Sequence, residues 1–561
     1  VESLGCVSVI CSDKTGTLTQ NKMTVQQVYV DGKVIDGKEL DLTDQTQRYL
    51  LYDAVLTNDS SIVDGKGIGD PTEYALLEMF RKIQVLPDSY FGKMGMHEDA
   101  LRKVMDRIEE VPFDSDRKLM STKYRIHGVP TILTKGAVDV LLDRCVSVRY
   151  GDGIRPMTEE EKEKIRLQNQ HFSENGLRVL AFAYKESNEM LCAQAECGYV
   201  FLGLISMVDP PRPESVRAVA EAKQAGIKTV MITGDHKVTA TAIAKQIGIF
   251  EEGDLALTGM ELDAMSEEEL DQKIDKISVY ARVSPENKIR IVEGWQRRGN
   301  IVSMTGDGVN DAPALKKADI GVAMGITGTE VSKDAAAMIL ADDNFATIIK
   351  AVANGRNVYR NIKNAVLYLL SGNTAAIFAV LYTSLMALPV PFAPVQLLFI
   401  NLLTDSLPAL AIGMEPADEG LLKEKPRDPK EGLMTKDFMI QMAAQGVLIA
   451  AVVITAFYLG LRSSTAMAST MAFSTLTLAR LFHGFNCRGK KSIFKLGFGT
   501  NPYSLYAFGA GALLLGLVIF IPGLHRLFQV QSMPVVSLLQ VAVLAFIPTL
   551  MIQMKRLICK K

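Results

Sequence analysis

The hydrophobic pattern divides the chain into two parts. Up to about residue 360, charged and apolar residues are mixed, and short apolar runs end in polar clusters, which is typical of a cytosolic enzyme. After about residue 364 the apolar runs are long enough to cross a bilayer, which takes about 20 mainly apolar residues. They predict six spanning helices, at about 364–388, 395–414, 438–461, 466–486, 503–528 and 533–554. Buried core helices are the alternative, but six such runs with short loops favour an all-α membrane bundle.

Basic residues are unevenly divided among the loops of this bundle. The 415–437 loop, the 487–502 loop and the C-terminal tail are rich in Lys and Arg, whereas the 389–394 loop, PVPFAP, carries no charge. Because Lys and Arg mark cytoplasmic loops, the two basic loops, the tail and the enzyme-like part are expected to face the cytoplasm. We therefore expect a multi-pass integral membrane protein whose lipid bilayer is an obligatory partner.

Composition excludes some other classes. The 561 residues carry 61 basic and 63 acidic side chains, a net charge of −2, which gives no indication of a nucleic-acid partner. The seven cysteines form no C-x-x-C pair, so they are interpreted as free thiols in a reducing compartment. The sequence starts without Met and reaches an apolar strand almost at once, which suggests that an N-terminal part is missing.

Three apolar strands in the first part each end in polar side chains. VSVICSD ends at Asp13, IKTVMITGD ends in Thr233, Gly234 and Asp235, and NIVSMTGDGVNDAP contains Asp307, Asn310 and Asp311. In open α/β sheets, ligands bind at the carboxyl ends of the strands, so these groups are expected to meet at one edge. Singly, each cluster would be interpreted as a turn. Three in one order, with Lys288 before the last strand, favour a functional site.

These groups suit phosphoryl transfer through an aspartyl phosphate. Asp13 would be the nucleophile, Thr233 and Gly234 would hold the transferring oxygens, and Lys288 would neutralise developing charge. Asp13 and Asp307 could hold Mg²⁺, which prefers oxygen ligands.

DKTGTLT at 13–19, TGD at 233–235 and TGDGVNDAPAL at 305–315 resemble the P-type cation-transporting ATPases. The resemblance implies a haloacid-dehalogenase-like α/β phosphorylation domain with an inserted α+β nucleotide-binding domain. It also implies that Asp13 is phosphorylated, that the carbonyl of Thr15 and the side chain of Asp307 hold Mg²⁺, and that Lys288 is the phosphate-site lysine. The expected domains are residues 1–22 and 211–350 for phosphorylation, 23–210 for nucleotide binding and 351–561 for the membrane.

Some 200 residues separate the first two strands, enough for a domain. No G-x-x-x-x-G-K-[ST] loop is present, but GDPTE, PFDSDRKLM, TKGAVDV and GLRVLAFA resemble the nucleotide domain of the same family. By that resemblance Phe113 stacks on the adenine of ATP. The other residues assigned to the nucleotide are Glu73, Lys118, Lys135, Arg178 and Arg282.

Oxygen-bearing side chains interrupt the predicted spans. Asn401 and Asp405 are four residues apart, which predicts a shared helix face with Thr404 beside it, and Asn373 lies in the preceding span. A carboxylate at mid-membrane is costly unless it has a function. Pro408 is expected to break the helix just after it. All-oxygen ligands suit a hard cation and not copper or zinc.

NLLTDSLPALAIGMEPAD resembles the calcium pumps, with two departures. Ala376 and Arg480 stand where the sarcoplasmic reticulum pump has glutamates, a pattern that resembles the single-calcium pumps of Gram-positive bacteria. An arginine that snorkels to the interface is the alternative for Arg480. The resemblance implies transport of one Ca²⁺ per ATP with return of protons across a bacterial plasma membrane. It also implies that the actuator domain and four membrane helices are absent from this chain.

Two alternatives remain open at this point. The same family could move Mn²⁺, a proton or a monovalent cation. A membrane-anchored phosphatase of the same superfamily is the other, but such phosphatases usually carry a second aspartate two residues after the nucleophile, where this chain has Thr15.

Overall fold

The computed structural model describes residues 2–63, 65–83, 93, 97–151, 153–193, 196–418, 420–428 and 431–558. The chain forms two compact units. One contains Ser8–Lys223 and Ile227–Ile349, and the other contains Val1–Val7, Gln224–Gly226 and Lys350–Lys561.

A parallel sheet of seven strands lies in the first unit. Its order is β14-β15-β13-β1-β16-β17-β18, so β1 (Val9–Asp13) is central, between β13 (Lys228–Thr233) and β16 (Val302–Gly306). The other strands are β14 (Leu255–Thr258), β15 (Ile277–Ala281), β17 (Ile320–Met324) and β18 (Met338–Leu340). The three central strands are almost entirely buried, as expected for a parallel sheet that helices cover on both faces. The predicted α/β architecture is therefore confirmed, while its haloacid-dehalogenase-like type stays a prediction.

Seven helices belong to this sheet. They are α7 (Pro213–Gln224), α8 (Lys237–Ile247), α9 (Gly259–Asp263), α10 (Glu267–Lys273), α11 (Pro285–Arg297), α12 (Ala312–Lys317) and α13 (Glu330–Ala335). Ile291 and Trp295 of α11 pack with Leu270 of α10 and Val302 of β16 in one buried cluster. This packing fixes α11, and therefore Lys288 in its first turns, against the sheet.

A second sheet, of nine strands, is inserted between β1 and β13. Its path is β10-β9-β12-β11-β8-β7-β6, and β2 pairs with β12 and β3. The strands are β2 (Thr24–Val30), β3 (Lys33–Asp36), β6 (Arg107–Asp114), β7 (Leu119–Ile126), β8 (Val129–Gly136), β9 (Cys145–Tyr150), β10 (Gly153–Pro156), β11 (Arg178–Glu186) and β12 (Tyr199–Val208). The short β4 (Ser61–Val63) and β5 (Lys66–Ile68) pair with each other.

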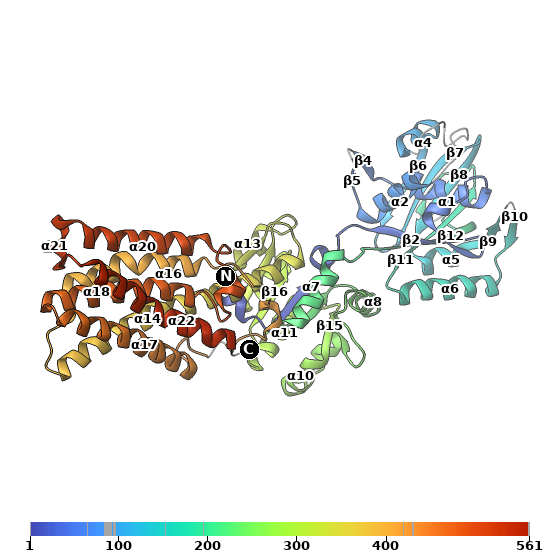
Figure 1. Cartoon of the computed structure of the whole chain (residues 1–561). Coiled ribbons are helices and arrows are strands. Elements are labelled where there is room, and N and C mark those ends of the chain that lie inside the picture. Colours follow the sequence, from blue (N-terminus) through green and yellow to red (C-terminus); the bar gives the residue numbers. More distant parts are fainter. Residues whose placement is uncertain are drawn as a thin grey trace. The chain divides into compact units, whose positions relative to one another are not determined.

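Helices cover both faces of the second sheet (Figure 1). One core contains apolar residues of α1 (Gln45–Leu56), α2 (Pro71–Lys82) and α4 (Glu98–Val104). A separate core contains residues of α5 (Val138–Asp143) and α6 (Glu159–Glu174). The α+β character expected for the insertion is present.

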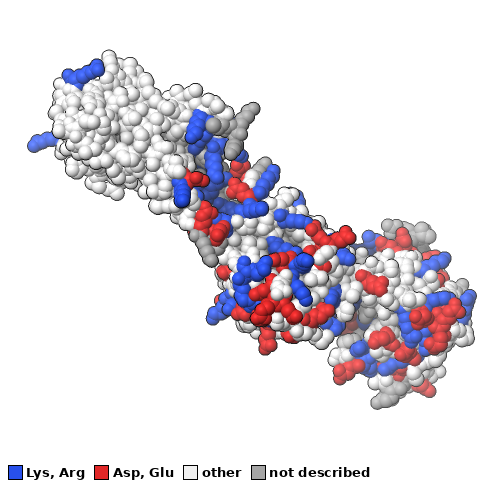
Figure 2. Space-filling model, turned by 90° about the horizontal axis from the view of Figure 1, so that it is seen from below, with Lys and Arg blue, Asp and Glu red and all other residues white. Residues whose placement is uncertain are grey.

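The other unit is helical. Its helices are α14 (Phe345–Leu385), α15 (Pro394–Phe399), α16 (Ser406–Gly413), α17 (Lys436–Leu461), α18 (Thr465–Asn486), α19 (Ile493–Leu496), α20 (Pro502–Phe520), α21 (Pro522–Phe528) and α22 (Val535–Ile558). In Figure 2 the part built from these helices shows few charged side chains on the visible face, whereas the α/β unit shows many of both signs. An uncharged surface of this kind suits contact with lipid.

Five helices in the described residues are long and apolar enough to cross a membrane: Phe345–Leu385, Pro394–Gly413, Lys436–Leu461, Pro502–Phe520 and Val535–Ile558. The predicted count of six is therefore not confirmed. The sixth prediction, 466–486, falls on α18, which is helical but carries Arg480, His483 and several hydroxyls. Most of α18 is buried against α17, α20 and α22, so it does not need an apolar surface toward lipid. The predicted 503–528 span is also interrupted, because Pro522 begins a separate helix.

The predicted 395–414 span is not a regular α-helix. Residues Ile400–Thr404 form a π-helical turn, in which the N–H of Asp405 donates to the carbonyl of Ile400 at 2.9 Å. The irregularity precedes Pro408, which lies inside α16, so the helix is interrupted before Asp405 and not after it as predicted. Pro408 has no N–H for the carbonyl of Thr404, the last residue of the π-turn. Single π-turns of this kind are frequent at functional sites.

Candidate functional site

Asp13 is the last residue of β1, the central strand of the parallel sheet. Its N–H donates to Thr305 Oγ1 on β16 at 2.9 Å, and its Oδ1 accepts from the N–H of Thr15 at 3.3 Å. The chain then turns through Lys14–Leu18, where Gly16 has a φ of +74° that favours glycine. These contacts fix the carboxylate at the end of the strand.

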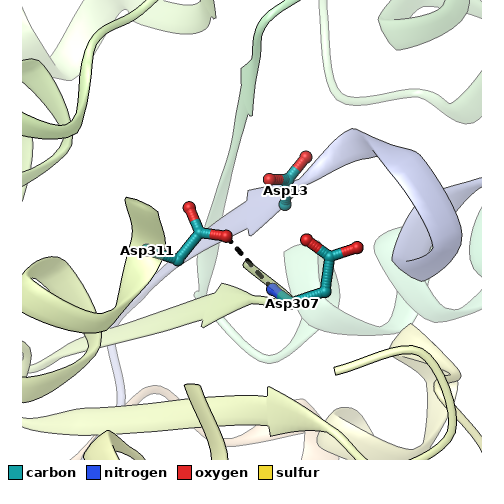
Figure 3. A group of neighbouring side chains, drawn as sticks. All are labelled: Asp13, Asp307 and Asp311. Carbon is teal, nitrogen blue, oxygen red and sulfur yellow. Dashed lines mark hydrogen bonds between the residues drawn. The ribbon is translucent and has the colours of Figure 1, made fainter. Parts of the chain in front are cut away.

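Three carboxylates meet at this edge. One oxygen each of Asp13, Asp307 and Asp311 lies within 4.8 Å of the others (Figure 3). Lys288 Nζ lies 3.2 Å from Asp13 Oδ2 and 2.5 Å from Asp311 Oδ1. Asp311 Oδ2 also accepts from the N–H groups of Asp307 and Gly308, at 3.1 and 3.0 Å. Asp311 thus holds the loop that presents Asp307.

The crowding of negative charge changes the acidity of these groups. Burial, and to a lesser degree Asp311, raises the pKa of Asp13, while Lys288 opposes the rise. Burial, Asp13 and Asp311 raise the pKa of Asp307 to about 6. For Lys288, burial lowers the pKa, but the two carboxylates outweigh burial and hold it above its usual value. The lysine is therefore a cation, and it balances only one of three acids.

The donor set fits magnesium. All three acids offer oxygen, the ligand that Mg²⁺ prefers, and Mg²⁺ is commonly held by one or two carboxylates together with phosphate oxygens. Burial and the two neighbouring carboxylates raise the pKa of Asp307, and a bound cation would lower it again.

The remaining predicted residues of this edge come from neighbouring loops. Thr233 ends β13, is buried, and its Oγ1 accepts from the N–H of Asp235 at 3.1 Å. Gly234 is exposed, and a Cβ added to it would meet no atom within 4 Å, so a ligand could approach its backbone. The carbonyl of Asp235 accepts from the N–H of Arg282 at 3.1 Å, which places Arg282 at this edge and not on the inserted sheet.

Asn310 follows β16 in a short helical turn and is exposed. Lys14 was not among the predicted residues, yet its Nζ contacts Asp235 Oδ2 at 2.5 Å and its side chain is 7% exposed. A lysine directly after the candidate nucleophile was the available signal.

On the inserted sheet, an ion pair joins two of the predicted nucleotide residues. Lys135 Nζ on β8 lies 2.7 Å from Glu73 Oε1 on α2, and both side chains are mostly buried. Burial lowers the pKa of Lys135, and Glu73 opposes that effect. Arg178, at the start of β11, donates to Thr72 Oγ1 at 3.1 Å. Three of the predicted residues are thus tied to α2 or the strands beside it.

Phe113 and Lys118 flank the β6–β7 turn, next to the strand that carries Lys135. Phe113 is 62% exposed, although it is a large apolar residue, and an exposed aromatic face is available for stacking. Lys118 is exposed and has a φ of +57°. Its carbonyl would lie 2.3 Å from a Cβ on Gly136, so only glycine fits there. Sequence reasoning missed Arg117, which forms a buried ion pair with Glu196 and donates to the carbonyl of Pro112.

In the helical unit, Asp405 and Arg480 form an ion pair in which both side chains are 2% exposed. Tyr368 Oη donates to Asp405 Oδ1 at 3.2 Å. Both terminal nitrogens of Arg480 lie 3.3 Å from Asn373 Oδ1. The structure therefore brings together Asp405, Asn373 and Arg480, and it places the arginine in the interior and not at an interface.

The predicted shared face of Asn401 and Asp405 is not found. Asn401 is exposed and Asp405 is 1% exposed, since the π-turn rotates the helix between them. Thr404 is buried, and its Oγ1 donates to the carbonyl of Ile400 at 3.1 Å.

Two family descriptions match the chain. Residues 46–214 match "P-type ATPase, cytoplasmic domain N", and residues 389–558 match "Cation transporting ATPase, C-terminus". The first range covers most of the inserted sheet, and the second covers the helices from α15 to α22.

Known relatives align over nearly the whole chain. Calcium-transporting ATPase 1 of Lactococcus lactis is 49% identical over 538 residues, which cover 95% of the chain and 60% of the relative. A calcium-transporting ATPase of Listeria monocytogenes is 48% identical over 95% of the chain and 60% of its own length. The calcium-transporting ATPase of Bacillus subtilis is 41% identical over 100% of the chain and 65% of its own length. The chain thus spans about 60% of the length of such relatives, and with both matching domains it belongs to the P-type cation-transporting ATPases.

Proposed function

We propose that the protein drives Ca²⁺ across a membrane with ATP, through a phosphorylated intermediate on Asp13. The observation that carries the phosphorylation step is the position of Asp13, at the end of the central parallel strand, 3.2 Å from Lys288 and beside Asp307 and Asp311. The calcium pumps among the relatives support the choice of ion.

A carboxylate oxygen of Asp13 attacks the γ-phosphorus of ATP. The bond from that phosphorus to the bridging oxygen breaks, and ADP leaves with the electron pair. Lys288 lies against Asp13 and neutralises charge that develops on the transferring group. The hydroxyl of Thr233 and the open backbone at Gly234 face the same edge and would donate to its oxygens. Thr15 stands where a phosphatase would carry its acid/base, so the acyl phosphate should be long-lived.

Magnesium would be held by Asp13, Asp307 and the carbonyl of Thr15, and when bound it would supply positive charge to the phosphate oxygens. Asp311 contributes by its hydrogen bonds to the loop of Asp307 and by its contact with Lys288. Asn310 and Asp235 belong to the same edge.

We assign nucleotide binding to residues 23–210 and phosphorylation to residues 1–22 and 211–350. The exposed ring of Phe113 would stack on adenine, while Glu73, Lys118, Lys135 and Arg178 would surround the nucleotide. Arg282, which lies beside Asp235, would meet the nucleotide from the phosphorylation side.

For the transported ion, Asp405, Thr404 and Asn373 would supply oxygen, whereas the exposed Asn401 lies off their face. Arg480 supports a stoichiometry of one Ca²⁺ per ATP, because its fixed positive charge would repel a second ion. Its contacts with Asp405 and Asn373 would belong to the calcium-free state and would break when the single ion binds. The return of protons is supported by the family resemblance alone. Transport would also need the segments that the relatives have and that this chain does not span. The helical unit would lie in a bacterial plasma membrane, and the soluble domains would face the cytoplasm.

Acid-stable labelling from [γ-³²P]ATP tests the first step. We expect one labelled residue, sensitive to hydroxylamine because it is an acyl phosphate, and loss of the label in Asp13→Asn with nucleotide binding kept. Asp319→Asn, a carboxylate of the same sheet that contacts Val302 and Gln296, is the matched control and should be labelled. Label that persists in Asp13→Asn would refute the assignment.

The ion is tested on the complete pump by labelling across series of free Ca²⁺, Mn²⁺ and Na⁺. Dependence on micromolar Ca²⁺ alone is expected. Activation by Mn²⁺ or by a monovalent cation in the absence of Ca²⁺ would favour the alternative cargo.

A further inference from the structure

Asp343 lies outside every motif discussed above, and its carboxylate is enclosed by donors. Oδ1 accepts from the N–H groups of Gly325 and Ile326 at 2.7 and 3.0 Å, and Oδ2 accepts from the N–H and Oγ1 of Thr327, both at 2.8 Å. The residue is 2% exposed. Its φ of +50° is uncommon for a side chain other than glycine. Four donors on one buried carboxylate indicate a specific task.

The donors belong to the tight loop 325–329 that follows β17. A Cβ on Gly325 would lie 2.6 Å from the carbonyl of Leu340, and one on Gly328 would lie 2.0 Å from the carbonyl of Met324, so the loop is folded closely on itself. Burial alone would raise the pKa of Asp343, but the donors outweigh burial and hold it below its usual value. Asp343 is therefore an anion, and its negatively charged carboxylate holds the loop by these hydrogen bonds.

This loop and helix α13, which follows it, reach the phosphorylation site. The N–H of Thr329 and Oγ of Ser332 both donate to the carbonyl of Asp307, at 2.8 and 3.1 Å. Thr327 Oγ1 would lie 3.8 Å from a Cβ on Gly16, in the turn after Asp13. Asp343 itself contacts neither Asp13 nor Asp307 through any described hydrogen bond, so its influence passes through the loop.

We propose that Asp343 is a positioning residue of the magnesium pocket: by holding loop 325–329, it sets the backbone of Asp307 and supports the turn of Gly16. The proposal rests on the proposed role of Asp307 as a magnesium ligand. It predicts that loss of the carboxylate weakens magnesium binding more than it weakens the fold, because the cation requires near-ideal geometry.

The test compares Asp343→Asn with Asp342→Asn. The amide keeps the shape of the side chain but replaces one acceptor oxygen by a donor that faces N–H groups. Asp342 is the matched control, since it is exposed and accepts from Asn344 and Thr347 instead of the loop. Ser332→Ala removes one contact to Asp307 and is the milder second variant.

Magnesium is titrated while thermal unfolding is followed by the fluorescence of Trp295, the single tryptophan, which is buried against the parallel sheet. The concentration of Mg²⁺ that gives half of the stabilisation should rise at least fivefold in Asp343→Asn and at least twofold in Ser332→Ala. It should stay within twofold in Asp342→Asn. At saturating Mg²⁺, labelling of Asp343→Asn from ATP should return to within twofold of the parent, which a purely structural defect would not permit.

Each outcome of these titrations supports or contradicts the proposed role of Asp343. Parent-like Mg²⁺ dependence of Asp343→Asn overturns the proposal, and so does a parent that Mg²⁺ does not stabilise. If Asp343→Asn does not fold, Thr327→Val decides in its place, because it removes one donor to Asp343 without touching Asp307; it should raise the same Mg²⁺ concentration at least twofold. If the parent responds to Mg²⁺ but takes no label, the phosphorylation proposal fails while the role of Asp343 is still measured.

Discussion

Replacement of Arg480 by Met tests the proposed single calcium site most directly. The guanidinium is in van der Waals reach of Gly372, where an added Cβ would lie 2.3 Å from Nε, and it contacts Asn373 and Asp405. Methionine keeps an unbranched stem that reaches to about the level of Nε, and it carries no charge. The variant therefore removes the positive charge and leaves Asp405 buried without its partner.

Two magnitudes follow from this geometry. Removing one partner of a buried pair costs about 3–5 kcal/mol, which destabilises the empty site. A divalent ion about 4 Å from a unit positive charge, at an effective dielectric near 20, is repelled by roughly 8 kcal/mol. Both effects favour calcium in the variant. Even about 3 kcal/mol corresponds to an affinity more than 100-fold higher, since about 1.4 kcal/mol is a factor of ten.

The assay is equilibrium binding of ⁴⁵Ca²⁺ to the complete pump, with phosphorylation sites counted by acid-stable label. We expect one ion per site in the parent and at least 100-fold tighter binding in Arg480→Met. Arg480→Lys keeps the charge and is the control, with an affinity much closer to the parent. Gly372→Ala displaces the guanidinium without removing it and should also alter calcium affinity.

Two ions bound per site in the parent would refute the reasoning. So would an Arg480→Met protein that folds and binds calcium with the affinity and pH dependence of the parent.

Three further predictions concern the nucleotide site, a buried ion pair of the helical unit and a buried carboxylate of the inserted domain. Phe113→Ala combined with Lys135→Ala should raise the ATP concentration needed for labelling at least tenfold but leave labelling by inorganic phosphate unchanged; an unaltered ATP dependence would remove both residues from the pocket. Arg488→Met breaks a fully buried ion pair and should lower the free energy of unfolding by about 3–5 kcal/mol, whereas Lys491→Met breaks an exposed pair and should cost less than about 1 kcal/mol in the same denaturant titration. Burial raises the pKa of Asp53 to about 7. The protonated carboxyl therefore contributes fully to the free energy of unfolding below about pH 4, and this contribution is lost as the pH rises to about 7. At 1.36 kcal/mol per pKa unit the loss is roughly 4 kcal/mol. Asp53→Asn should therefore be more stable than the parent at pH 8 but not at pH 4, and equal pH profiles would contradict the argument.

The strand-end pattern determined much of the α/β unit from sequence alone. Asp13, Thr233 and Asp307 each follow an apolar strand, and parallel strands must end at one edge, so their meeting could be predicted without coordinates. The length of the insertion likewise indicated a separate domain, and the resemblance of its motifs predicted that this domain binds the nucleotide. Lys288 was found because it stands between the last two of these strand ends in the sequence.

The tertiary structure decided the membrane part. Hydropathy reports whether a segment is apolar enough to face lipid, so it identified the five apolar helices. It could not show that neighbouring helices enclose α18, so that Arg480 lies in the interior of the helical unit. Helical spacing assumed 3.6 residues per turn, and the π-turn at Ile400–Thr404 separates Asn401 from Asp405 despite their spacing of four. Asp343 shows the same limit in the soluble part, since its donors become neighbours only when β17 and β18 pair and bring the two loops together. Local sequence thus specifies strands, helices and the order of the motifs. Which side of a helix is enclosed, and which distant loop a carboxylate holds, depends on packing between elements that are far apart along the chain.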